Sequence, residues 1–206
     1  MRNRGARPRS RGIRGEPRPD SNLSFTHRLP LTQAAVEFTR ERHSGQHRRA
    51  DGAAFVVHPL EVASLLERSR YPDHVVAAGV LHDVLEGTDA DRAELEERFG
   101  PGVARLVSTL TDDPSIPDEE ERKDDVRERV RRAGGYSPAI YAADKVSKVR
   151  ELRTMLITGI SDHEAEVRLE RYRKSLRMLE ETIPASRLVE LLQFELEALE
   201  RLPPRG

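Results

Sequence analysis

The sequence predicts an all-α fold, a helical bundle in one domain, and three observations support this prediction. From Leu31 onward, apolar residues recur at spacings of three and four, which is the period of an amphipathic helix. Alternating or β-branched runs typical of strands are hard to find. The 206 residues, 36% of them hydrophobic, suffice for one core of ordinary size and a tail. We therefore place the domain at residues 31–202.

Turn and capping signals divide this domain into helices. Thr32 and Asp73 are expected to act as N-caps, and Pro59 suits the first turn of a helix. Gly87 is expected to end the third helix. The expected helices cover approximately residues 32–43, 59–68, 73–86, 91–99, 101–110, 117–133, 137–156, 162–181 and 184–201.

Composition excludes several kinds of chemistry. The chain has no cysteine, so disulfides, thiolate nucleophiles and sulfur-rich zinc sites are excluded, and any metal must be held by His, Asp or Glu. There is no run of 18 apolar residues, and no apolar segment follows the basic N-terminus. We therefore expect neither a membrane span nor a secretory signal. The protein is expected to be cytoplasmic.

Residues 1–30 differ in charge from the rest of the chain. They hold eight Arg against Glu16 and Asp20, an excess of +6, so the other 176 residues must sum to -7 for a net charge of -1. A segment rich in Arg, Pro and Gly has little to bury and is expected to be disordered. It could contact nucleic acid electrostatically, but a solvated extension is the more ordinary interpretation.

Two helices are apolar on nearly every side, which predicts that they are buried within the bundle. They are Val75–Leu85 and Ala139–Val149. The first contains His82 and Asp83, and the second contains Asp144. A carboxylate buried in an apolar interior costs several kcal/mol unless a cation meets it, so a metal ion reached from both helices would satisfy all three residues.

Two further residues fit such a site. His58, at the start of its own helix, can supply a fourth ligand. Successive helical residues point about 100° apart, so His82 and Asp83 can share an ion only at the face between them. Glu86 follows on that face one turn later, where it could act as a general acid or base, although an exposed surface Glu is an equally good interpretation.

Five sequence blocks, in order, carry a family resemblance that extends from about residue 32 to 155. They are HSGQHRR, VVHPLEVASLL, GVLHDVLEGT, FGPGVARLVSTLT and YAADKVSKVR. Together they resemble the HD-domain phosphohydrolases and, within these, the guanosine tetraphosphate hydrolases of the RelA/SpoT type. The chain is similar to the short, stand-alone alarmone hydrolases, since it has no room for the other domains of the long enzymes.

The resemblance implies a metal site and a catalytic acid. His58, His82, Asp83 and Asp144 match the four ligands of a manganese ion, and another divalent transition metal would also suit this set. Glu86 matches one member of an acidic pair that assists the attacking water. The metal would lower the pKa of water and neutralise phosphate oxygens.

The resemblance also implies contacts with a guanine nucleotide. Arg48 and Arg49 match basic residues that contact the nucleotide, since Arg can stack on a base and bind phosphate, although a solvated basic loop would explain them as well. Lys145 matches a Lys or Arg beside the last ligand. Lys148 stands where the family has an Asn that helps to hold the nucleotide.

Two positions depart from the family pattern. Gly87 replaces the second acid of the pair, and Lys148 replaces the Asn. Asp89 or Asp91 could substitute for the missing acid. The sequence therefore predicts a hydrolase that removes the 3′-pyrophosphate of guanosine tetra- or pentaphosphate. The alternatives are an HD hydrolase for another phosphorylated nucleotide and a catalytically weak protein that binds alarmone.

Overall fold

The structure is a computed structural model that describes residues 28–201, and this part of the chain is helical, which confirms the all-α prediction. Its only pairing of extended backbone is an isolated bridge between His47 and Ala54. The predicted disorder of the tail falls on residues 1–27, outside the described residues. The helices are α1 (Pro30–Arg42), α2 (Val57–Arg68), α3 (Asp73–Leu81), α4 (Val84–Gly87), α5 (Arg92–Leu110), α6 (Glu119–Ala133), α7 (Ser137–Thr158), α8 (Asp162–Thr182) and α9 (Arg187–Glu200).

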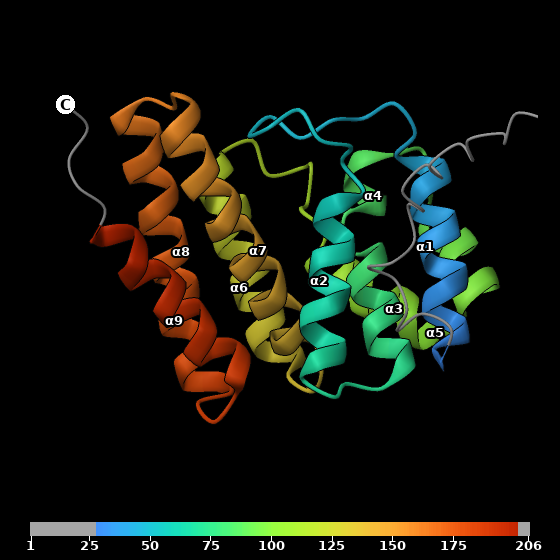
Figure 1. Ribbon diagram of the computed structural model, residues 1–206. Helices are drawn as coiled ribbons and strands as arrows, with labels where there is room; N and C mark the ends of the chain where they lie inside the picture. The colour runs from blue at the N-terminus through green and yellow to red at the C-terminus, as the bar shows by residue number, and fades with distance from the viewer. Residues whose placement is uncertain (1–27, 202–206) are drawn as a thin grey trace, which may run out of the picture.

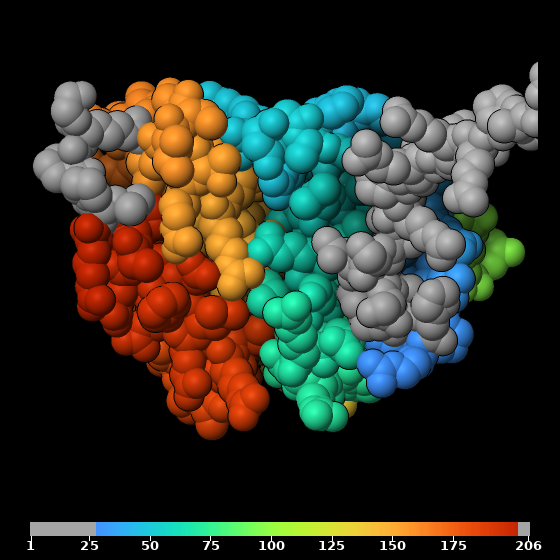
Figure 2. All heavy atoms as spheres, in the orientation of Figure 1, coloured from blue at the N-terminus to red at the C-terminus, as the bar shows by residue number. Residues whose placement is uncertain are grey.

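Helices α2, α3 and α7 form the middle of the bundle (Figure 1). Helices α1 and α5 pack on α3 at one end, and α8 and α9 pack on α7 at the other. Figure 2 shows the same division at the surface, with α9 in red at one end and α1 in blue at the other. No helix among residues 28–201 is long and apolar enough to span a membrane.

The two helices predicted to be buried are enclosed as expected. Residues 75–81 of α3 and residues 139–144 of α7 are each at most 3% exposed, apart from Gly79, which is also buried. Neighbours on several sides explain this, since α3 packs against α1, α2 and α5, whereas α7 packs against α2, α8 and α9. The site residues therefore stand on the most enclosed helices of the fold.

The predicted caps of α1 and α3 are wrong. Helix α1 begins at Pro30, and neither Thr32 nor Asp73 caps its own helix with its side chain. Instead, the Asp73 carboxylate accepts hydrogen bonds from the backbone N–H groups of Leu31 and Thr32, both at 2.9 Å, and from the Thr32 hydroxyl at 2.6 Å. Asp73 thus caps α1 across the interface, which short-range capping rules do not anticipate.

The predicted continuous helix over residues 73–86 is interrupted. Helix α3 ends at Leu81, His82 and Asp83 form a turn, and the single-turn α4 follows. The Asp83 dihedral angles (φ -97°, ψ -3°) lie at the edge of the right-handed helical region, and its carbonyl accepts the N–H of Gly87 at 2.9 Å. The break expected at Gly100 is a kink inside α5, with Gly100 at φ +83°.

Gly79 lies at the contact between α2 and α3. A Cβ atom at this position would lie 2.4 Å from Cδ1 of Leu66 on α2, which is closer than real contacts allow. The backbones of the two helices approach each other because this residue has no side chain. His58 on α2 and His82 after α3 are brought together by the same approach.

Candidate metal centre

The four predicted ligands converge at one point in the middle of the bundle. His58 comes from the first turn of α2, His82 and Asp83 from the turn between α3 and α4, and Asp144 from the middle of α7. The two histidine Nε2 atoms are 3.2 Å apart. Asp144 Oδ1 lies 3.2 Å from His58 Nε2, and Asp83 Oδ2 lies 3.1 Å from His82 Nε2. His58, His82 and Asp144 are buried, while the Asp83 side chain is 17% exposed.

The turn between α3 and α4 explains how neighbouring residues reach the same point. In a continuous helix, His82 and Asp83 would point about 100° apart. At the break between α3 and α4, Oδ2 of Asp83 lies 3.1 Å from Nε2 of His82. The two neighbouring ligands therefore meet at a break in the helix that the sequence did not predict.

Hydrogen bonds fix the orientation of both imidazoles. Nδ1 of His82 lies 2.8 Å from the carbonyl of Gly79, which can only accept, so this nitrogen carries a hydrogen. Nδ1 of His58 lies 2.9 Å from the hydroxyl of Ser147, whose own hydrogen goes to Glu61 at 2.7 Å, so the hydroxyl oxygen accepts. In the neutral form, both Nε2 atoms therefore direct lone pairs into the cluster.

An extended ion-pair chain supports His58 from behind. The carboxylate of Glu61 is bound by Arg150 at 2.7 Å, and Arg150 also binds Glu195 of α9 at 2.7 Å. Arg153 binds the second oxygen of the same glutamate. These ion pairs connect α2, α7 and α9 next to the ligand His58.

The charges of the cluster need a cation. Burial would lower the pKa of His82, but the carboxylates of Asp83 and Asp144 raise it to about 10. Burial would also raise the pKa values of the two acids, yet His82 and Lys148 hold that of Asp83, and Lys145 and Lys148 hold that of Asp144, well below the usual range. Two carboxylates thus attract positive charge to the facing imidazole nitrogens, as a proton or as a metal ion.

The cluster fits a divalent transition metal. Donor atoms about 2.1 Å from one ion are themselves about 3.0–3.4 Å apart, which is close to the distances between these side chains. Oδ1 of Asp144 is buried and makes no well-aligned hydrogen bond, although Nζ of Lys148 lies 3.1 Å away. Two imidazoles with two carboxylates form a donor set that suits Mn²⁺, Fe²⁺ or Zn²⁺.

A small cavity of about 20 Å³ lies beside the ligands and leads toward a larger basic one. Its walls include three of the ligands together with Glu86, Asp112, Lys123, Tyr141, Lys145 and Lys148. The larger cavity, about 210 Å³, lies between α6, α7 and α8. Its walls are Glu119, Lys123, Arg127, Tyr141, Lys145, Lys148, Arg168, Arg171, Tyr172 and Ser175. Since Lys123, Tyr141, Lys145 and Lys148 line both, the two spaces are neighbours.

The two lysines of α7 bind the buried acid from both sides. Nζ of Lys145 lies 2.7 Å from Oδ2 of Asp144 and 4.4 Å from the centre of the Tyr141 ring. Lys148 is 33% exposed and also approaches Asp83 Oδ1, at 4.0 Å. Both ammonium groups therefore stand between the ligands and the larger cavity.

The two predicted nucleotide-binding arginines lie in the loop between α1 and α2. Arg48 is paired with Asp51, and Arg49 is paired with Glu164 of α8 at 3.0 Å. Arg49 is 72% exposed. Neither lines the small or the larger cavity.

The acidic residues near the cluster make different contacts. Glu86 is exposed on α4 and lines the small cavity. Asp89 is paired with Arg42 at 2.7 Å, and Asp91 caps α5 by accepting from the N–H of Glu94; neither lines the small cavity. Asp112, which the sequence analysis did not single out, lines the cavity with Glu86.

Sequence analysis also missed Ser147 and Glu61, although a signal was available. Ser147 follows Asp144 by three residues, and Glu61 follows His58 by three. Such a spacing puts two side chains on the same helix face. The basic residues of α8 gave no comparable signal, because a charged helix face is usually solvated.

Comparison with known proteins identifies the family. The family profile described as HD domain matches residues 35–186. The chain belongs to the HD-domain family. The chain is 35% identical over 138 residues to the guanosine-3′,5′-bis(diphosphate) 3′-pyrophosphohydrolase MESH1 of Mus musculus, an alignment that covers 64% of the chain and 75% of MESH1. The chain is also 35% identical over 129 residues to the enzyme of the same name from Danio rerio. This alignment covers 61% of the chain and 71% of that enzyme.

Two solved structures resemble this HD domain. One is described as a metazoan ortholog of SpoT that hydrolyzes ppGpp; it superposes with a TM-score of 0.73 at 27% identity over 84% of this chain and 97% of that one. The other is lmo0812 of Listeria monocytogenes, with a TM-score of 0.62 at 25% identity over 69% of this chain and 94% of that one.

Proposed function

We propose that this HD-domain protein is a metal-dependent phosphohydrolase that removes the 3′-pyrophosphate from guanosine tetra- or pentaphosphate. The observation that carries the proposal is the buried cluster of two histidines and two aspartates beside a cavity lined with lysines and arginines. The relatives named as 3′-pyrophosphohydrolases support the substrate, because the chain spans most of their length. We assign the activity to residues 31–202, in the cytoplasm, as part of the stringent response.

The metal would be held by His58, His82, Asp83 and Asp144, and we propose manganese as the ion. When bound, a divalent ion supplies a Lewis acid that lowers the pKa of water and neutralises phosphate oxygens. The hydrogen bonds from Nδ1 of each histidine keep the Nε2 lone pairs directed at the ion.

The residues beside the ligands would position and stabilise the substrate. Lys145 and Lys148 stand between the ligands and the basic cavity, where their ammonium groups can bind a pyrophosphate and reduce its negative charge. Arg127, Arg168 and Arg171 line the same cavity, although each is ion-paired to an acid in this structure. A bound phosphate would compete with those acids for the guanidinium groups.

Glu86 is our candidate for the group that accepts the proton of the attacking water. It lines the small cavity at the ligands, is exposed, and is close enough to raise the pKa of Lys148. A positioned general base of this kind contributes about 10²–10⁴ in rate. Arg48 and Arg49 would contact the guanine nucleotide, which requires each to exchange its present carboxylate partner for the ligand.

A second function deserves a test because of Lys148. Its ammonium adds positive charge 3.1 Å from a ligand oxygen, which suits a different phosphorylated nucleotide as the substrate of the same chemistry. A protein that binds alarmone without rapid turnover is the remaining alternative.

The deciding experiment uses purified protein reconstituted with manganese and a panel of nucleotides, including guanosine tetraphosphate, guanosine pentaphosphate and GTP. We expect pyrophosphate to be released from the two alarmones and not by the His82→Ala variant. Cleavage of another nucleotide alone would favour the second function. Thermal stabilisation by alarmone without release of pyrophosphate would show a binding protein.

A further inference from the structure

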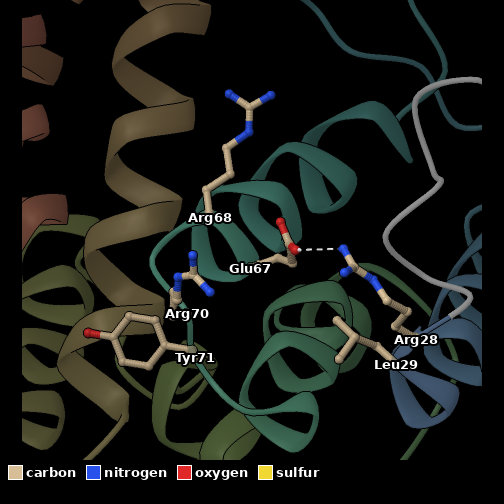
Figure 3. Close-up of a pocket in the computed structure, with 6 residues that line it drawn as sticks. All are labelled: Arg28, Leu29, Glu67, Arg68, Arg70 and Tyr71. Atoms are coloured by element: carbon tan, nitrogen blue, oxygen red, sulfur yellow. Dashed lines mark ion pairs between the residues drawn. The ribbon is translucent and has the colours of Figure 1, made fainter.

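A second cavity, of about 530 Å³, lies at the other end of α2 from the metal cluster. Its walls are Arg28, Leu29, Glu67, Arg68, Arg70 and Tyr71, which we call the α2 groove (Figure 3). Arg68 is ten residues along the helix from His58, or roughly 15 Å. The groove shares no wall residue with either cavity at the ligands.

The groove carries excess positive charge. Figure 3 shows Arg68 and Arg70 on one side of Glu67 and Arg28 on the other. Arg28 reaches Glu67 at 3.9 Å, whereas Arg68 and Arg70 are exposed and form no ion pair with any residue in the described range. Most arginines of residues 28–201 are ion-paired, and the exceptions are Arg40, Arg68, Arg70, Arg105 and Arg187. Two of these five unpaired guanidinium groups share this one groove.

The backbone at Arg70 points to a role for its side chain. Arg70 has φ +63° and is the only residue other than glycine with positive φ among residues 28–201. It follows the end of α2, where its N–H bonds to the carbonyl of Glu67 at 2.8 Å and the N–H of Tyr71 bonds to that of Leu66 at 3.1 Å. Glycine is favoured at this position of a helix end, so an arginine here is held in a conformation that is unfavourable for its backbone.

Two further features indicate the kind of ligand. Residues 1–27, which directly precede Arg28 in the sequence, contain seven arginines against Glu16 and Asp20, so this segment has an excess of positive charge. Tyr71 packs edge-on against Tyr136 with ring centroids 6.2 Å apart, and Tyr136 is 43% exposed. Two unpaired guanidinium groups in one groove with the ring of Tyr71, which packs against the exposed Tyr136, suit a phosphate backbone with unpaired bases.

We propose that the α2 groove binds the phosphate backbone of single-stranded RNA. Exposed guanidinium groups along this groove suit the repeated charges of an extended polyanion. Arg68 and Arg70 would each bind a phosphate, which is a contact that does not depend on base sequence. This proposal is independent of the hydrolytic activity.

The test measures binding of a fluorescein-labelled single-stranded RNA of about 20 nucleotides to the full chain by anisotropy, over a range of salt concentrations. We expect Arg68→Gln/Arg70→Gln to lower the affinity at least tenfold at 0.1 M salt. Loss of two phosphate contacts should also reduce the slope of log K against log salt by about 1.4. The matched control Arg105→Gln/Arg187→Gln removes two equally exposed and unpaired arginines from α5 and α9, and should change the affinity less than twofold.

Arg70→Gly separates binding from folding. Glycine accepts the positive φ, so this variant should melt about 2 °C higher than the native protein while binding RNA less tightly. Unchanged RNA affinity in both groove variants would overturn the proposal. It would also be overturned if deletion of residues 1–20 abolished RNA binding while the groove substitutions left the affinity unchanged. Competition by GTP or inorganic phosphate as effective as that by unlabelled RNA would also overturn it, because the groove would then be a site for a small anion.

Discussion

Ser147→Ala should weaken metal binding although it replaces none of the four metal ligands. The Ser147 hydroxyl accepts from Nδ1 of His58 at 2.9 Å and donates to Glu61 at 2.7 Å. Alanine removes both bonds, so Nδ1 of His58 loses its acceptor. The imidazole is then free to place its hydrogen on Nε2, where it opposes a metal ion.

The size of the effect follows from the loss of this one support. Partners that orient a metal-bound histidine typically contribute 10–100-fold to metal affinity, which is about 1.4–2.7 kcal/mol. Glu61 keeps its ion pair with Arg150, so the charge behind the histidine is retained. A buried hydrogen bond contributes about 1 kcal/mol to folding, so the melting temperature should fall by only about 2–4 °C.

Isothermal titration of metal-free protein with Mn²⁺ measures the effect, and Ser175→Ala is the matched control. Ser175 is 1% exposed, as is Ser147, but its hydroxyl bonds to Tyr141 and to the carbonyl of Arg171. The control should lose similar stability and keep its metal affinity. Equal metal affinities for the Ser147 variant and the native protein would refute the argument that the hydroxyl fixes the tautomer of His58.

Three further variants test other parts of the structure. Gly87→Asp introduces the second acid of the family pattern. Gly87 does not have a positive φ, and a Cβ at this position would lie 3.1 Å from Cε1 of His43, so we expect the variant to fold. Its alarmone turnover should rise at least tenfold in a pyrophosphate-release assay. Lys148→Asn removes an ammonium 3.1 Å from a ligand oxygen, so titration with Mn²⁺ should show affinity raised about tenfold, and weaker binding would contradict this. Asp73→Ala removes the cap of α1 and should cost about 1–3 kcal/mol in urea unfolding, whereas an unchanged midpoint would show that water replaces the carboxylate.

Periodicity and turn residues were enough to predict the helical order and the burial of α3 and α7. Asp91 was expected at the start of a helix and does cap α5. The convergence of His58 with the residues after α3 was expected because acids in enclosed helices need a cation. Each of these predictions depends on local sequence, or on the cost of burying charge.

The features that were not predicted depend on contacts between distant residues. Asp73 caps a helix 41 residues earlier in the chain, so its own neighbours give no hint of it. The turn at His82 follows the apolar residues Val80 and Leu81, and Gly79 lies inside the regular part of α3, so no Gly or Pro at the turn itself signals the end of the helix. Asp112 lines the cavity because α5 and α6 meet there, which is a property of the packed bundle.

Gly79 connects helix packing with ion binding. It allows α2 and α3 to approach, and its carbonyl accepts the hydrogen of His82 Nδ1. The separation of the two imidazole Nε2 atoms therefore depends on how far apart these two backbones lie. Metal affinity can thus serve as a sensitive reporter of interhelical spacing, and core substitutions far from any ligand should be detectable in a metal titration before they are detectable in the helical content.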